Sequence, residues 1–95
     1  MNKEFREIIY RKAFDHFGKG NQITVAIEEL SELIKELCKV QRGKMNIEHI
    51  VEEIADVEIM IEQLRMIFNS DRDIEKVKAQ KIERLECRIS GVDNG

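Results

Sequence analysis

Hydrophobic residues recur along this chain at steps of three and four, the spacing of residues that share one face of an α-helix. The pattern is continuous over four segments, at about residues 3–17, 21–41, 46–68 and 71–89. Gly18 and Gly20 are suited to end the first segment, and Asn21 and Asn46 are suited to cap the second and third. We therefore expect an all-α fold of four helices in a single domain, residues 1–95, with a frayed tail at about residues 90–95.

The third segment carries apolar residues on two sides. One side is a sustained heptad seam of Ile47, Ile50, Ile54, Val57, Ile61, Leu64 and Phe68. The other side, roughly 100 to 180° further around the helix, consists of Val51, Ala55, Ile59 and Met66. A helix that is apolar on two sides needs cover on both. Because three partner helices can cover it only in part, we expect a bundle completed by homo-oligomerisation, as a dimer or a tetramer.

Charge and composition argue against several classes of partner. The formal net charge is −3 and the basic residues form no long run, so nucleic acid is not an expected partner. No apolar stretch reaches membrane-spanning length, and no signal-peptide pattern opens the chain. The cysteines, Cys38 and Cys87, have no CxxC spacing. The simplest interpretation is a cytoplasmic protein with reduced cysteines and no membrane partner.

Two acidic pairs stand within the second and third segments: Glu29 with Glu32, and Glu53 with Asp56. In each pair the carboxylates are three residues apart, which places them on one helical face. A helical projection puts all four at the margins of apolar faces, whereas the neighbouring Glu28 turns towards solvent. Carboxylates brought together repel one another, and their usual compensation is a hard divalent cation with oxygen ligands. We expect these four residues to hold magnesium, with manganese as a substitute.

The residues around the pairs resemble a known signature. The run Glu28-Glu29-Leu30-Ser31-Glu32, followed after about twenty residues by Glu53-Ile54-Ala55-Asp56, is similar to the EExxE…ExxD pattern of the all-α nucleoside triphosphate pyrophosphohydrolases. Residues 26–33 and 52–57 look like the short, single-domain MazG-like members of that superfamily. The resemblance covers the second and third segments closely and the fourth loosely, which is about two-thirds of the chain.

This resemblance implies hydrolysis of a nucleoside triphosphate between its α- and β-phosphates, giving a monophosphate and pyrophosphate. It also implies that the carboxylates of Glu29, Glu32, Glu53 and Asp56 hold magnesium and form the catalytic centre. A metal that bridges phosphate oxygens neutralises developing charge, and water activated beside it is a competent nucleophile near neutral pH. One of the glutamates is a candidate for the base. The implied role is that of a house-cleaning or nucleotide-pool enzyme.

The resemblance further implies that the last helix supplies basic residues to the phosphates. The candidates here recur at three- and four-residue spacing: Lys78, Lys81, Arg84 and Arg88. The asparagine often found in this part of the family is not clearly present, with Gln80 nearby instead. Asn21 and Gln22, at the turn into the second segment, are candidate contacts for the base or sugar, and Asn21 is also suited to cap the helix.

Other interpretations stay open. A non-catalytic helical oligomerisation or interaction module would use the same acidic residues for solubility alone. Within the superfamily, phosphoribosyl-ATP pyrophosphohydrolases and dUTP/dCTP-type pyrophosphatases are alternatives. The former typically continue after the aspartate with a Tyr-His pair, whereas this chain reads Asp56-Val57-Glu58. His16 and His49 do not form the Glu-x-x-His pattern of di-iron helical bundles, which argues against that class.

Overall fold

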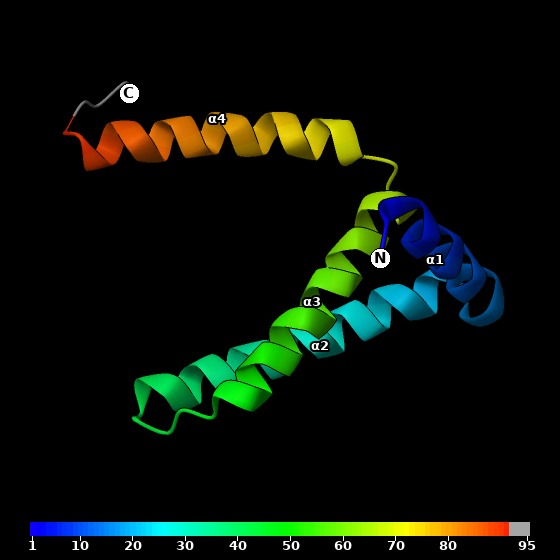
Figure 1. Cartoon of the computed structure of the whole chain (residues 1–95), viewed down its shortest axis with the longest axis horizontal. Helices are drawn as coiled ribbons and strands as arrows, with labels where there is room; N and C mark the ends of the chain where they lie inside the picture. The colour runs from blue at the N-terminus through cyan, green and yellow to red at the C-terminus, as the bar shows by residue number, and fades with distance from the viewer. Residues whose placement is uncertain (92–95) are drawn as a thin grey trace.

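The computed structural model describes residues 1–91, and its regular secondary structure is entirely helical (Figure 1). The elements are α1 (Lys3–Phe17), α2 (Lys19–Gln41), α3 (Ile47–Ile67) and α4 (Asp71–Ile89). The predicted all-α class and its four helices are therefore confirmed. Of the predicted tail, residues 92–95 lie outside the described part of the chain.

The junction between α1 and α2 differs from the prediction. α2 begins at Lys19 with Gly18 at its N-cap position, so the predicted cap at Asn21 is wrong. Gly18 has a φ of 91°, a conformation that glycine adopts without the steric cost of a Cβ atom, and this single residue both ends α1 and starts α2. Asn21 instead lies in the first turn of α2, where its Nδ2 donates a hydrogen bond to the Phe17 carbonyl at 2.6 Å.

α2 and α3 run side by side in opposite directions and form the main packing unit of the chain (Figure 1). α3 begins at its predicted cap, where Asn46 Oδ1 accepts a hydrogen bond from the backbone N–H of His49 at 3.2 Å. Ala26 from α2 and Ile50 and Met60 from α3 are buried in this hairpin. Burial of these side chains stabilises the pairing of the two helices.

A buried polar contact also joins the two helices. Gln22 Nε2 donates a hydrogen bond to Gln63 Oε1 at 2.7 Å, and the two residues expose 7% and 4% of their surface. A buried amide without a partner is costly. Sliding one helix along the other would break this contact, so the pair favours a single register of α2 against α3.

The predicted heptad seam of α3 is divided between two environments. Ile50, Val57 and Leu64 are buried or half-buried. The other members expose between 41% and 63% of their surface: Ile47, Ile54, Ile61 and Phe68. A helical projection places exposed residues of α2 on the same side of the hairpin: Ile27, Leu30, Ile34 and Leu37. We refer to these four residues, together with Ile47, Ile54 and Ile61, as the apolar face of the hairpin.

α1 is attached to the body through a small polar and aromatic contact. Tyr10 and Phe14 are the buried residues of α1. The Tyr10 hydroxyl donates a hydrogen bond to Glu62 of α3 at 2.5 Å, and Arg6 Nη1 donates to the second oxygen of the same carboxylate at 3.1 Å. Burial, followed by the hydrogen bond to Glu62, raises the pKa of Tyr10 to about 12.

α4 leaves the body instead of packing along it. Figure 1 shows α3 and α4 meeting at a corner and diverging from it like the arms of a V. At the corner Asn69 has a φ of 47°, a left-handed conformation that asparagine tolerates. Arg65 of α3 holds the corner, since its Nε donates to Asp71 at 2.5 Å and its Nη2 to Glu75 at 2.7 Å. α4 lies wholly within the described residues, and none of its side chains is buried.

The resulting molecule is too open for a compact monomer of its size. Its radius of gyration is 16.6 Å, whereas a compact chain of this length has about 12 Å. Its accessible surface is 7719 Å² for a mass of 11.2 kDa, whereas a compact monomer of that mass exposes about 5700 Å². Each chain therefore exposes about 2000 Å² more than expected. None of the helices in residues 1–91 combines the length and apolar character that a membrane crossing requires.

Candidate functional site

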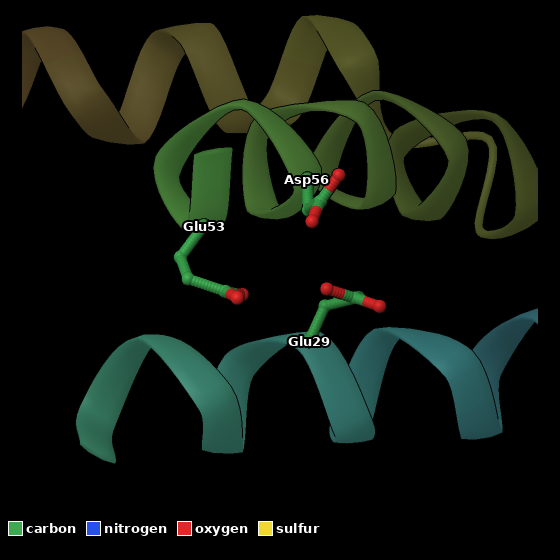
Figure 2. A group of neighbouring side chains, drawn as sticks. All are labelled: Glu29, Glu53 and Asp56. Carbon is green, nitrogen blue, oxygen red and sulfur yellow. The ribbon is translucent and has the colours of Figure 1, made fainter. Parts of the chain in front are cut away.

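The α2–α3 hairpin brings carboxylates from both acidic pairs together. Figure 2 shows Glu29 pointing from α2 towards α3, with Glu53 and Asp56 pointing back from α3. One carboxylate oxygen from each residue lies within 4.8 Å of those of the other two. The 3.6-residue period of α3 places Glu53 and Asp56 on one side of the helix. The antiparallel pairing then sets Glu29 opposite them, so three of the four predicted metal ligands form one cluster.

The cluster lies beside packed residues, and this shapes its electrostatics. Glu29 and Glu53 are half-buried, whereas Asp56 is exposed. Burial raises the pKa of Glu29 above its ordinary value, and the negative charges of Asp56 and Glu53 raise it further. Burial likewise raises the pKa of Glu53, followed by the charges of Asp56 and Glu32. Both shifts indicate that the surroundings disfavour the charged form of these two carboxyl groups.

One oxygen of the cluster has no partner. Glu53 Oε2 is fully covered by surrounding atoms and forms no hydrogen bond. Burying a carboxylate oxygen in this way costs free energy, because its hydrogen bonds to water are lost and no hydrogen bond within the protein replaces them. Binding a cation would supply the missing interaction. The cluster therefore has the donor chemistry of a hard divalent metal site: carboxylate oxygens with uncompensated charge.

Glu32, the fourth predicted ligand, is exposed and lies outside the cluster of three. Its charge nevertheless raises the pKa of both Glu29 and Glu53, so it borders the same site. A side-chain rotation of Glu32 within its helical turn would change its distance from the cluster. Its role as a ligand stays a prediction.

Glu36 is a site residue that the sequence analysis did not select. It exposes 7% of its surface, and its charge contributes to the raised pKa of Glu53. Its carboxylate oxygen lies 3.3 Å from Lys39 Nζ and 3.9 Å from His49 Nδ1. The signal was present in the spacing, since Glu36 follows Glu32 by one helical turn and continues the same acidic strip.

The predicted phosphate-binding residues of α4 are exposed and belong to a helix that diverges from the hairpin. Lys78 forms an ion pair within its own helix, with Glu75 at 3.4 Å. Ion pairs join the first turns of α4 to the rest of the chain, from Asp71 and Glu75 to Arg65 and from Asp71 to Lys3. Within one chain, Lys81 and Arg84 thus have no described contact with the acidic cluster. Their role stays a prediction, as does that of the exposed Asn21.

A separate cleft of about 1000 Å³ lies among α1, α3 and α4. Tyr10, Phe14 and Met66 line its apolar part. Most of its charged side chains pair with one another, as Arg6 does with Glu62 and Arg11 with Glu7. Because most cations of the cleft are already paired with carboxylates, the cleft is a poorer site for a polyanionic ligand than the acidic cluster with a bound metal would be.

Comparisons with models of known protein families, with curated proteins and with solved structures returned no match to this chain.

Proposed function

We propose that this protein is a magnesium-dependent nucleoside triphosphate pyrophosphohydrolase that cleaves between the α- and β-phosphates. The observation that carries the proposal is the cluster of Glu29, Glu53 and Asp56, whose oxygens converge within 4.8 Å from two helices. The resemblance of these residues to the EExxE…ExxD signature supplies the reaction. Manganese is expected to substitute for magnesium, because both accept carboxylate oxygens.

The spacing of the oxygens suits such an ion. Magnesium binds oxygen at about 2.0–2.1 Å, so the oxygens that hold one ion lie no more than about 4.2 Å apart. The carboxylate oxygens of the cluster lie within 4.8 Å of one another, which small side-chain rotations would close. A magnesium ion held there would supply positive charge to offset the developing negative charge of the phosphates and to acidify a water molecule. Glu29, Glu53 and Asp56 would hold the ion. A carboxylate of the acidic strip that does not bind the ion would accept the proton of the attacking water.

The proposal includes assembly of the enzyme as a homo-oligomer, at least a dimer. The excess surface of about 2000 Å² per chain matches the large interfaces of obligate dimers, which bury roughly 2000 to 5000 Å² in total. The apolar face of the hairpin supports the same inference, because an exposed contiguous apolar patch marks an interaction site. A two-fold axis would pair this face with itself.

A second candidate function is a non-catalytic helical oligomerisation module. The observation that favours it is the number of exposed apolar side chains. A binding partner that covers them would account for this surface without any catalytic activity. The two candidates differ in metal binding. The module would bind neither magnesium nor manganese appreciably, whereas the enzyme must bind at least one of them.

Calorimetric titration with magnesium and manganese, followed by a screen for pyrophosphate release from common and modified nucleoside triphosphates, tests the proposal. Glu53→Gln and Asp56→Asn keep side-chain volume and remove charge. Each should abolish measurable metal binding and lower the rate about 100-fold or more, since a metal supplies several kcal/mol of transition-state stabilisation.

Glu28→Gln is the matched control, because Glu28 is exposed and lies outside the cluster. It should keep the parental rate and metal affinity. Glu52→Gln is a weaker control, since the charge of Glu52 contributes to the raised pKa of Glu53. A parent protein that binds neither ion, or variants with unchanged binding and rate, would overturn the enzyme proposal in favour of the module.

A further inference from the structure

The polar contacts between α2 and α3 form a regular ladder along the hairpin. Three pairs face each other at steps of seven residues on each helix: Gln22 with Gln63, Glu29 with Asp56, and Glu36 with His49. Seven residues span about 10 Å of an α-helix. The pair Glu36–His49 therefore lies about 10 Å beyond Glu29, towards the turn between α2 and α3, and Glu53 lies between the two, one helical turn from His49.

The two ends of this ladder differ in charge. Towards α1 the acidic cluster is followed by the buried residues Ala26 and Met60 and then by the neutral amide pair. Towards the turn, Glu36 Oε1 lies 3.3 Å from Lys39 Nζ and 3.9 Å from His49 Nδ1. Among the ion pairs given for residues 1–91, these two place basic side chains on the acidic strip. A phosphate chain that extends from the cluster thus meets positive charge in the direction of the turn.

The basic side chains and the acidic cluster open to the same side of the hairpin. A helical projection places His49 and Asp56 on one margin of α3, and Glu32 and Lys39 on the facing margin of α2. These four residues are exposed or half-buried, and their margins lie away from the apolar face. A ligand that approaches from this side can therefore reach the cluster and both basic side chains.

Glu36 lowers the stability of the fold in two ways. It exposes 7% of its surface, and an apolar residue of similar volume would pack there without the cost of burying a charge. Its negative charge also adds to the repulsion that raises the pKa of Glu53. What the carboxylate does achieve is to hold one basic side chain from each helix, Lys39 from α2 and His49 from α3. Side chains held in place before a ligand arrives lose less conformational entropy when it binds.

We propose that Glu36 is a positioning residue that holds Lys39 and His49 as the basic end of the site, and that this end receives the pyrophosphate part of the nucleoside triphosphate. The inference deepens the proposed function and rests on it for the identity of the substrate. Lys39 Nζ donates hydrogen bonds to phosphate oxygens, and His49, whose Nδ1 faces Glu36, has Nε2 left to do the same. The nucleoside then points in the opposite direction, towards the end of α2 where Asn21 lies.

The two histidines of the chain, His16 and His49, allow a test on the parent protein. Inorganic pyrophosphate is added to the magnesium-loaded full-length protein, and the ring resonances of both histidines are followed by NMR, with His49→Gln identifying those of His49. The His49 resonances should shift, and those of His16, whose ring packs against Phe17 in α1, should stay unchanged. No binding of pyrophosphate, or unchanged His49 resonances at saturation, would overturn the proposal.

Calorimetric titration of the magnesium-loaded protein with pyrophosphate tests Lys39. Lys39→Gln should weaken the affinity about tenfold or more, because a charge-assisted hydrogen bond is lost, and Lys39→Arg should restore most of it. Lys12→Gln is the matched control, since it removes the same charge from an exposed position of α1. Screening by salt should keep its effect within about twofold. Equal losses of affinity in Lys39→Gln and Lys12→Gln would show a general effect of net charge and overturn the contact.

The sign of the effect of Glu36→Gln separates positioning from simple charge. If Glu36 acted through its negative charge alone, its removal would strengthen the binding of pyrophosphate. Positioning predicts the opposite, a several-fold loss of affinity, while the affinity for magnesium alone is retained. Tighter binding of pyrophosphate by Glu36→Gln would overturn the role of Glu36. Should this variant fail to fold, the His49 resonances of the parent and the Lys39 variants still decide whether the basic end exists.

Product inhibition tests the direction of the substrate. Lys39→Gln should weaken inhibition by pyrophosphate and leave inhibition by the nucleoside monophosphate unchanged, and the reverse result would overturn the orientation. If the parent protein hydrolyses no triphosphate, the proposed function fails. The binding of pyrophosphate and the His49 resonances would still decide whether Glu36, Lys39 and His49 form an anion-binding end.

Discussion

The buried pair Gln22–Gln63 allows the packing of the site-forming hairpin to be tested quantitatively. Gln63→Leu removes the acceptor of a 2.7 Å hydrogen bond and leaves the Gln22 amide at 7% exposure without a partner. Leaving one buried polar group unsatisfied costs about 1 to 3 kcal/mol, whereas replacing both partners by apolar groups is nearly neutral. We therefore expect a loss of about 1 to 3 kcal/mol for Gln63→Leu and recovery of most of it in Gln22→Leu/Gln63→Leu.

Thermal melting measures this effect. For a domain of this size, 1 kcal/mol corresponds to roughly 4 to 8 °C in the melting temperature, so the single variant should melt on the order of 10 °C lower. All proteins must be compared at one concentration, because association contributes to apparent stability. Gln80→Leu is the matched control, since the same change occurs at an exposed position of α4. It should shift stability by no more than about 0.5 kcal/mol.

Two outcomes would contradict the proposed role of the Gln22–Gln63 hydrogen bond. If Gln63→Leu and Gln80→Leu have the same melting temperature, the hydrogen bond does not contribute to stability. If the double variant loses as much as the two single variants added together, the two amides act independently and do not set the register of α2 against α3. Coupling between them should appear as a non-additive term in the double-mutant cycle.

Two further predictions concern titration. Because the folded protein binds the protons of Glu29 and Glu53 more tightly than the unfolded chain does, metal-free protein should lose stability as pH rises from the ordinary pKa of 4.5 through the raised folded-state pKa. Melting curves between about pH 4 and pH 8 should show this loss, and Glu53→Gln should reduce it. An equal dependence of the melting temperature on pH in the variant would contradict the assignment. Tyr10, the one tyrosine of the chain, should ionise only near its raised pKa of about 12, so the stability it contributes below pH 10 is lost as pH rises from 10 to about 12. Tyrosinate absorbance measures this ionisation, and Glu62→Gln should lower the pKa. Ionisation near pH 10 in the folded protein would contradict the hydrogen bond between Tyr10 and Glu62.

The sequence by itself determined the helical class, the extent of most helices and the acidic character of the candidate site. Apolar spacing and caps act within a few residues, so α3 begins at Ile47, directly after its predicted cap Asn46. The spacing of Glu53 and Asp56 also places both carboxylates on one face through the period of the helix alone. The start of α2 was missed because Gly18, with its positive φ, joins two helices without a loop, and Asn21 offered an equally good local cap.

Only the tertiary structure decided which groups meet. The register of α2 against α3 sets Glu29 opposite Glu53 and Asp56, leaves Glu32 at the border and buries Glu36. A helical wheel gives the direction of a side chain but not its height relative to a neighbouring helix, so this selection could not be read from spacing. The course of α4 likewise depends on the Arg65 contacts across the corner. These contacts between α3 and α4 direct α4 away from the acidic cluster of its own chain, a course that the spacing of residues within α4 does not determine.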